Sequence, residues 1–207
     1  MIDLRPRLRL YLVADPDHCR GDLFETVETA LRGGVTIVQL RAKQLSDKEL
    51  LAQSRSLRDV CHRFNAAFIV NDRVDIALAS HADGVHLGVD DLPVAEARKL
   101  GGSGFIIGYS PETDEQIRSA ADRGVDYLGI GPVFGTHTKS DAGEAFGLAE
   151  LRRRIKLGGL PAVGIGGINN ENAGSVLDIG ADGIAVVSAI LGAPDPEAAT
   201  RQLSRNS

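Results

Sequence analysis

Short apolar runs alternate with segments of helical periodicity along almost the whole chain. The runs are rich in β-branched residues, which predicts strands at residues 8–14, 35–40, 67–70, 84–87, 105–108, 127–130, 162–165 and 183–187. The segments between them space apolar residues three or four positions apart, which predicts helices at residues 22–32, 46–64, 74–80, 93–100, 113–123, 148–155, 170–179 and from 195 onwards. Strands that alternate with helices in this way indicate a parallel sheet covered by helices.

The junctions from helix to strand form a weak internal repeat. Four of them share a Gly- or Ala-rich stop followed by an apolar strand, with the sequences G-G-V-T-I-V, A-D-G-V-H-L, R-G-V-D-Y-L and G-A-D-G-I-A-V. A chain of like strand–helix units should show such a repeat. Eight units favour closure into one α/β domain over residues 1–207, a (β/α)₈ or TIM barrel. The alternative is an open doubly wound sheet, but no G-x-G-x-x-G follows the first strand.

The composition narrows the classes of function. With 207 residues, of which 43% are hydrophobic and 25% charged, the chain has the make-up of a globular domain. Its net charge of −5 argues against nucleic-acid binding, so any anionic ligand would need local positive groups. No apolar run approaches the roughly 20 residues of a membrane span. Cys19 and Cys61 are two isolated cysteines, which predicts reduced thiols in a cytoplasmic protein. The sequence does not decide whether the protein forms a homo-oligomer.

A glycine-flanked loop follows the sixth predicted strand at residues 131–147. It contains Thr136, His137, Thr138 and Lys139, which are hydrogen-bond donors and a cation suited to an anionic ligand. Loops of this length inside compact domains are usually either functional or disordered. Glycines on both sides would let the loop close over a ligand. We therefore expect an active-site loop here, with a plain surface connection as the alternative.

Polar residues also follow most of the other predicted strands. Each one alone has a simple explanation, because Asp, Asn and Ser often start the next helix. In a barrel, however, the carboxyl ends of all strands meet at one rim, where active sites lie. The residues that would share this rim are Gln39, Arg41, Lys43, Asn71, Asp72, Asp90, Asp91, Ser110, Gly166, Gly167, Val187 and Ser188. His86 lies within a strand and is expected to be a hydrogen-bonded histidine of the barrel interior.

The residue types predict two anion sites on this rim. Arg41, Lys43 and Lys139 with the carboxylates Asp72 and Asp91 suit a polyphosphate with Mg²⁺, which one or two carboxylates and phosphate oxygens usually hold. The glycine-rich residues 163–168 together with 187–188 suit a monophosphate, which barrels often bind after strands seven and eight. No G-x-S-x-G, H-E-x-x-H, C-x-x-C or Walker A motif is present.

Six motifs resemble the thiamine-phosphate synthase family and occur in that family's order. They are Q-L-R-A-K at residues 39–43, I-V-N-D at 69–72, D-G-V-H-L-G-V-D-D at 83–91, G-Y-S at 108–110, G-P-V-F-G-T-H-T-K at 131–139 and V-G-I-G-G-I at 163–168. The resemblance implies a (β/α)₈ barrel and a transferase that joins hydroxymethylpyrimidine diphosphate to a thiazole phosphate, in its plain or carboxylated form. Thiamine phosphate and pyrophosphate would be the products, with Mg²⁺ as cofactor.

The resemblance also implies roles for residues. Asp72 and Asp91 would be the metal ligands, and Arg41, Lys43, Ser110 and Lys139 would be catalytic. The pyrimidine diphosphate would contact Gln39, Arg41, Lys43, Asn71, Ser110 and Lys139. The thiazole phosphate would contact Thr136, Thr138, Gly166 or Gly167, Val187 and Ser188.

The implied mechanism is a dissociative displacement, in which the aminopyrimidine stabilises a methylene cation and no general base is needed. One residue departs from the family pattern: Val89 stands where the family commonly has glutamine before the acidic pair, and this removes a polar contact but no metal ligand. The motif register favours Asp91 over Asp90 as the second ligand, and His137 has no assigned role. The alternatives are a related thiazole tautomerase, which would need acid–base groups instead of a polyphosphate site, and a non-catalytic phosphate-binding barrel.

Overall fold

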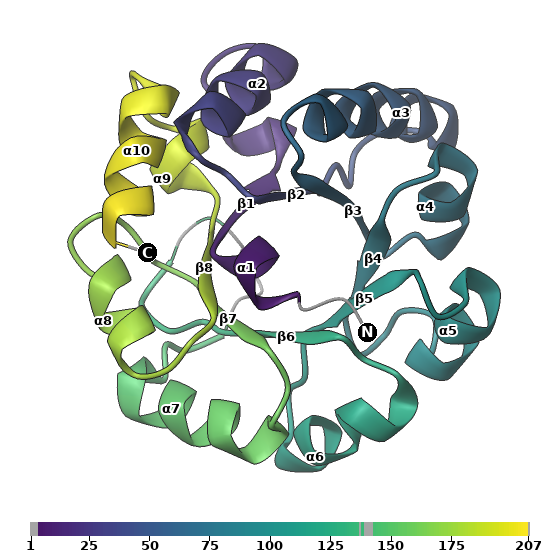
Figure 1. The fold of residues 1–207 in the computed structure, drawn as a ribbon, viewed down its shortest axis with the longest axis vertical. Helices are drawn as coiled ribbons and strands as arrows, with labels where there is room; N and C mark the ends of the chain where they lie inside the picture. The colour runs from purple at the N-terminus through teal and green to yellow at the C-terminus, as the bar shows by residue number, and fades with distance from the viewer. Residues whose placement is uncertain (1–3, 137, 139–142, 207) are drawn as a thin grey trace.

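The predicted barrel is present in the computed structural model, which describes residues 4–136, 138 and 143–206 (Figure 1). Eight parallel strands pair in chain order, and β8 pairs with β1 to close the barrel. The strands are β1 (Leu10–Ala14), β2 (Ile37–Leu40), β3 (Ala67–Asn71), β4 (Gly84–Leu87), β5 (Ile106–Tyr109), β6 (Tyr127–Ile130), β7 (Ala162–Ile165) and β8 (Gly183–Val186). Because all eight are parallel, their carboxyl ends form a single rim.

Helices surround the strands as an outer ring (Figure 1). The connecting helices are α2 (Leu23–Gly33), α3 (Asp47–Arg63), α4 (Val74–Ser80), α5 (Val94–Gly101), α6 (Asp114–Arg123), α7 (Gly147–Gly158) and α8 (Ala173–Asp178). Shorter or terminal ones are α1 (Arg5–Leu8), the 3₁₀ turn η1 (Pro16–His18), α9 (Ser188–Leu191) and α10 (Pro196–Asn206). Ser46 and Glu49 form a capping box at the start of α3.

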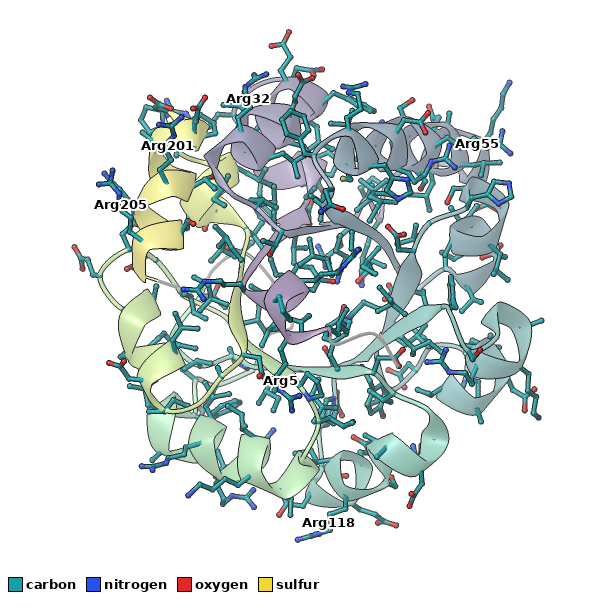
Figure 2. All side chains as sticks on the ribbon, in the orientation of Figure 1. Arg5, Arg32, Arg55, Arg118, Arg201 and Arg205 are labelled. Carbon is teal, nitrogen blue, oxygen red and sulfur yellow. The ribbon has the colours of Figure 1, made fainter. Side chains whose placement is uncertain are left out.

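The barrel interior is filled by side chains and closed at its base by α1. Leu4 and Leu8 pack against strand residues that include Tyr11, Ile69 and Tyr127. Figure 1 shows α1 lying across this end of the barrel. In Figure 2 the labelled Arg32, Arg55, Arg118, Arg201 and Arg205 point outward from the outer helices, whereas Arg5 belongs to α1 at the base of the barrel. The interior therefore opens toward the opposite rim.

The repeated helix-to-strand junction has a structural role at the base. The residue just before each even-numbered strand accepts a hydrogen bond from a backbone N–H of the preceding odd-numbered strand. Thr36 accepts from Leu10, Asp83 from Phe68, Asp126 from Ile107 and Asp182 from Ala162, at 3.1, 2.7, 2.7 and 2.9 Å. We call these four residues the base clamps.

Each clamp aspartate is also paired with a basic side chain from a neighbouring element. Arg98 Nη2 donates to Asp126 at 2.6 Å, His62 Nε2 lies 2.9 Å from Asp83, and Arg5 Nε lies 2.9 Å from Asp182. Each such carboxylate therefore links a strand to a neighbouring helix. In the four repeated junctions, threonine or aspartate stands directly before the strand because its side chain accepts this hydrogen bond.

Three elements differ from the prediction. The first strand begins at Leu10 rather than residue 8, because residues 5–8 form α1 with Pro6 in its first turn. The last strand ends at Val186, because α9 begins at Ser188. Helix α8 begins at Ala173 rather than residue 170, because Asn169 and Asn172 side chains accept backbone hydrogen bonds in a turn before it. The other elements match to within a few residues.

Across the part of the chain that the structure describes, no helix is both long and apolar enough to cross a membrane.

We expect Asp126→Ala to lower the free energy of unfolding by about 1–3 kcal/mol, because it leaves the buried Ile107 N–H without its acceptor and Arg98 without its ion pair. Urea unfolding measures this. Asp122→Ala is the matched control, since Asp122 is an exposed residue of α6, and it should change stability by less than about 0.5 kcal/mol. Equal losses in the two variants would contradict the clamp.

Candidate active site

A cavity of about 1160 Å³ lies at the carboxyl ends of the strands and receives residues from all eight strands or the loops that follow them. Every predicted site residue that the structure describes lines it. These are Gln39, Arg41, Lys43, Asn71, Asp72, Asp91, Ser110, Thr136, Thr138, Gly166, Gly167, Val187 and Ser188. Lys139 and His137 lie outside the described residues. The single rim expected from the strand ends is thus present.

Two carboxylates face each other on the β3–β4 side of the cavity. Asp72 follows β3 with a left-handed φ of 62°, and its N–H donates to the His86 carbonyl at 2.8 Å. Asp91 accepts from the Gly88 N–H at 2.6 Å. Burial raises the pKa of Asp72 to about 6, and the charge and hydrogen bond of Asp91 add to the increase, while Lys43 and Arg41 oppose it. Such a pair needs either a shared proton or a cation.

The two cationic side chains on this side of the cavity, Lys43 and Arg41, each lie close to a carboxylate. Lys43 Nζ lies 4.0 Å from Asp72 Oδ2. Arg41 forms an ion pair with Asp15, which is almost fully buried at the end of β1. Asp15 also lines the cavity, although in sequence it only follows the first predicted strand. By holding one guanidinium nitrogen, Asp15 fixes the position of Arg41 on the rim.

A chain of hydrogen bonds crosses the barrel interior beneath the cavity. Gln39 Nε2 donates to the Tyr11 hydroxyl at 2.6 Å, which lies 2.8 Å from the Tyr127 hydroxyl. Tyr127 in turn lies 3.0 Å from His86 Nδ1, and His86 Nε2 lies 2.8 Å from Ser110 Oγ. We call this set the interior relay. It confirms His86 as a hydrogen-bonded interior histidine, and it adds Tyr11 and Tyr127, which the sequence places only within predicted strands.

A glycine makes room for this chain. Gly108 of β5 pairs in register with both His86 and Tyr127. A Cβ at this position would lie 2.2 Å from the Tyr127 ring and 2.4 Å from His86 Nδ1. No side chain fits there without breaking the contact between the two rings. The glycine of the G-Y-S motif is therefore required by the relay.

The relay has a direction that follows from counting hydrogens. Burial raises the pKa of Tyr11 and of Tyr127 far above the usual range, so both phenols keep their protons. Tyr11 accepts from Gln39, so its own hydrogen goes to Tyr127, and that of Tyr127 goes to His86 Nδ1. A neutral His86 then carries its proton on Nε2 and donates to Ser110. The hydroxyl hydrogen of Ser110 is left to donate to a ligand in the cavity.

Apart from Arg154, the described residues that line the β6–β8 side of the cavity are neutral. Thr138 N–H donates to Thr136 Oγ1 at 3.2 Å, and Thr138 Oγ1 lies 3.4 Å from Ser188 Oγ. Gly166 and Gly167 have φ values of 99° and 64°. A Cβ on Gly167 would lie 2.4 Å from the Gly135 carbonyl oxygen, so glycine lets the loop after β6 approach the turn after β7.

Both ends of the predicted active-site loop are anchored by backbone hydrogen bonds. Val133 N–H donates to Ile165 O at 2.9 Å and Phe134 N–H to Gly166 O at 3.0 Å. At the other end, Gly147 N–H donates to Val133 O at 3.0 Å. Residues 137 and 139–142, between these anchors, lie outside the described part of the chain.

Comparisons with known proteins agree with this geometry. The family model described as thiamine monophosphate synthase matches residues 10–190. A thiamine-phosphate synthase of Laribacter hongkongensis is 48% identical over 94% of this chain and 92% of its own. One from Moorella thermoacetica is 49% identical over 96% of this chain and 95% of its own. A solved structure, thiamine phosphate pyrophosphorylase from Pyrococcus furiosus, has a TM-score of 0.90 and 41% identity, covering 99% of this chain and 97% of its own.

The chain belongs to the thiamine monophosphate synthase family. Membership confirms the family resemblance of the six motifs and assigns the chain to the transferases of thiamine biosynthesis. A 3-hexulose-6-phosphate synthase with a TM-score of 0.75 shares 18% identity and shows only the common fold. The six motifs of this chain contain the acidic pair, Ser110, Thr136, Thr138 and the two glycines, and all of these residues line the cavity.

The direction of the relay can be tested by ¹⁵N NMR of the histidine rings near neutral pH. We expect Nε2 of His86 to be protonated and Nδ1 to be unprotonated, because Tyr127 donates to Nδ1. In Tyr127→Phe this donor is absent, so the preference between the two tautomers should weaken. A proton fixed on Nδ1 in the unmodified protein would show that the relay runs the other way.

Proposed function

We propose that the protein condenses 4-amino-5-hydroxymethyl-2-methylpyrimidine diphosphate with 4-methyl-5-(2-phosphoethyl)thiazole, or its carboxylated form, to give thiamine phosphate and pyrophosphate. The observation that carries this proposal is one cavity with two unlike sides. One side has paired carboxylates beside Arg41 and Lys43, and the other has hydroxyls and glycines. The first suits a diphosphate with a metal ion, and the second suits a single phosphate ester.

The acidic pair fits Mg²⁺. Burial and then the neighbouring Asp91 raise the pKa of Asp72, and a cation bound between the two carboxylates would relieve their repulsion. Within the described residues no three His, Cys, Asp or Glu side chains gather as a metal site. This agrees with Mg²⁺, which takes one or two carboxylates and completes its shell with phosphate oxygens and water. Mg²⁺ bound there would neutralise charge on the diphosphate and on the leaving pyrophosphate.

The chain's own residues orient the pyrimidine and stabilise the leaving group. Gln39 uses its amide N–H on Tyr11, which leaves its carbonyl oxygen as an acceptor for the amino group of the pyrimidine. Asn71 lies at the end of β3 beside the acidic pair. Arg41 and Lys43 supply positive charge to the diphosphate, and such fixed charges are usually the largest catalytic contribution. Lys139 would add to them from the loop.

Ser110 acts as a hydrogen-bond donor in this scheme. The interior relay orients it so that its hydrogen is available to the diphosphate ester oxygen or to the pyrimidine. Tyr11, Tyr127 and His86 are therefore positioning residues. Both ring nitrogens of His86 have partners in the relay, so His86 is not poised as a general base. A dissociative displacement needs none, because the thiazole nitrogen attacks with a free lone pair.

The remaining roles belong to the phosphate side and to the loop. Thr136, Thr138, Gly166, Gly167, Val187 and Ser188 would bind the phosphate ester through hydroxyl and backbone N–H groups. Residues 131–147 would act as an active-site loop that keeps water from the methylene cation. A cytoplasmic location and a homo-oligomeric state stay predictions.

The proposal is tested by measuring pyrophosphate release from the two substrates. Release should require the pyrimidine diphosphate, the thiazole phosphate and Mg²⁺ together, because the displacement consumes both substrates. Thiazole isomerisation without pyrophosphate would favour a tautomerase instead. Binding of both substrates by folded protein without turnover would favour a non-catalytic barrel.

Variants of the acidic residues assign the metal site in the same assay. Asp72→Asn and Asp91→Asn should each raise the Mg²⁺ concentration needed for half-maximal rate by roughly ten-fold or more, because each removes one carboxylate ligand. Asp90→Asn is the matched control, since Asp90 is an exposed neighbour that also lines the cavity. If Asp90→Asn changed the Mg²⁺ requirement and Asp91→Asn did not, the second ligand would be Asp90.

A further inference from the structure

The two sides of the cavity differ in charge as well as in residue type. The β2–β4 side contains Arg41, Lys43, Asp72, Asp90 and Asp91. Among the described lining residues from β6 to α9, by contrast, Arg154 is the one charged side chain. A phosphate monoester carries a charge of about −1.5 to −2 at neutral pH. The hydroxyl and backbone N–H groups of this side can donate hydrogen bonds to it but cannot neutralise it.

Arg154 projects from α7 and is held in place by two neighbours. Its Nε donates to Glu150 Oε1 at 2.9 Å, one helical turn earlier. The guanidinium carbon lies 4.7 Å from the centre of the Phe146 ring, which also lines the cavity. Only 19% of the Arg154 side chain is exposed. The group is therefore oriented before a ligand arrives, which reduces the entropy lost on binding.

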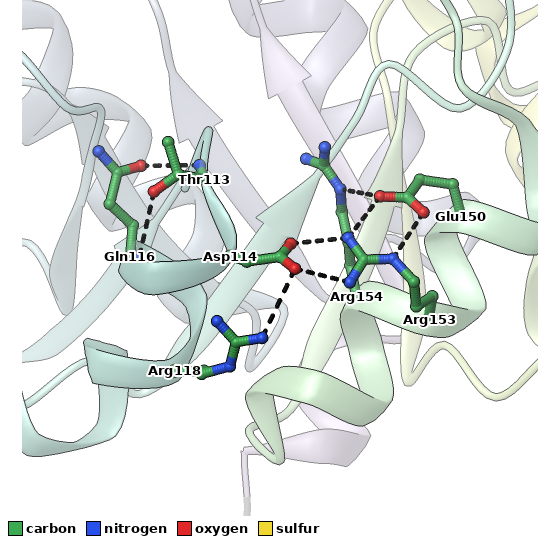
Figure 3. A network of polar contacts seen from close by, with 7 residues as sticks. All are labelled: Thr113, Asp114, Gln116, Arg118, Glu150, Arg153 and Arg154. Atoms are coloured by element: carbon green, nitrogen blue, oxygen red, sulfur yellow. Dashed lines mark hydrogen bonds and ion pairs between the residues drawn. The ribbon is translucent and has the colours of Figure 1, made fainter.

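The network behind Arg154 carries an excess of positive charge (Figure 3). Arg153 lies between two carboxylates, 2.6 Å from Asp114 and 2.7 Å from Glu150, and Arg118 lies 3.7 Å from Asp114. Three arginines thus share two carboxylates. Hydrogen bonds first from Arg153 and then from Arg154 lower the pKa of Glu150 to about 2, so Glu150 stays ionised.

The excess charge is available on the cavity side of this network. Arg153 donates to both carboxylates with three of its nitrogens. Arg154 uses one of its five N–H groups, the one on Nε, for Glu150. The N–H groups on its two terminal nitrogens donate no hydrogen bond to any residue that the structure describes. Glu150 and Phe146 thus fix the guanidinium of Arg154, and its two terminal nitrogens stay available to a phosphate.

We propose that Arg154 binds the phosphate of the thiazole substrate through its terminal nitrogens and supplies the positive charge that the other described lining residues of this side lack. The assignment rests on the proposed function, which places a phosphate ester beside Thr136 and Gly167. The diphosphate is the less suitable partner, because Arg41, Lys43 and the acidic pair that fits Mg²⁺ lie on the other side. An arginine fits phosphate because its planar N–H groups can donate in pairs to the oxygens.

Calorimetric binding of the thiazole phosphate, without the pyrimidine substrate, tests this role. Arg154→Gln should raise the Kd by roughly ten-fold or more, because a charge-assisted hydrogen bond is lost. Arg154→Lys, which keeps the charge but not the paired N–H groups, should lose less. The unphosphorylated thiazole alcohol should bind the unmodified protein and Arg154→Gln with the same Kd, since it has no phosphate to contact.

Two arginines of the same helix serve as controls. Arg152→Gln removes the same formal charge from an exposed residue and should leave the Kd within about two-fold, because exposed charges are screened. Arg153→Gln loosens the network without removing a cavity residue and should act mainly on the melting temperature. An unchanged Kd in a folded Arg154→Gln protein, or an equal loss in Arg152→Gln, would overturn the role of Arg154. An unmodified protein that does not bind the thiazole phosphate would instead overturn the proposed function, and this role with it.

Discussion

The closed register of the eight strands is the constraint on which the rest of the molecule depends. At the base, Thr36, Asp83, Asp126 and Asp182 each tie an even-numbered junction to the odd-numbered strand before it. A parallel barrel is held together by contacts between residues that are distant in sequence, so such links must fix the strands against sliding. With the base fixed and closed by α1, the strand ends on the opposite rim meet in a defined arrangement. The site residues come from different strands, and their distances follow from this closure.

The hydrogen bonds inside the barrel then determine which groups on the rim can donate to a ligand. Five polar side chains lie in a region where an unpaired hydrogen-bonding group would be costly. They satisfy one another in a chain from Gln39 to Ser110, and Gly108 leaves space for it. Because each hydroxyl has a single hydrogen, the order of donors sets the tautomer of His86 and the role of Ser110. Folding requires that buried polar groups have hydrogen-bond partners, and here this requirement also orients the Ser110 hydroxyl at the candidate site.

The sequence predicted much of the fold because its patterns are local. Periodicity and caps located the eight strands and most helices, and the parallel closure placed nearly all candidate residues on one rim. The errors have local causes as well. Four residues at each of α1 and α9 are too few to show a helical period, and asparagine side chains replaced the first turn expected of α8.

The residues that sequence reading missed are those whose role depends on tertiary neighbours. Asp15 reads as the end of a strand until Arg41 is seen beside it, and Tyr11 and Tyr127 read as core aromatics until their hydroxyls meet. Arg154 reads as an ordinary surface partner of Glu150, because the i, i+4 spacing is typical of exposed helix faces. One signal was available for the clamps: the shared T/D position of the repeated junction, although its hydrogen bond could not be seen in the sequence.

We propose that the cavity is divided into a metal–diphosphate side at β2–β4 and a phosphate-ester side at β6–β8. A crystal structure of the protein with Mg²⁺, pyrophosphate and thiamine phosphate tests it most directly. We expect Mg²⁺ and pyrophosphate beside Asp72, Asp91, Arg41 and Lys43, with the phosphate of thiamine phosphate against Thr136, Gly167 and Arg154. A phosphate ester bound beside Arg41 and Lys43, with pyrophosphate on the neutral side, would contradict it.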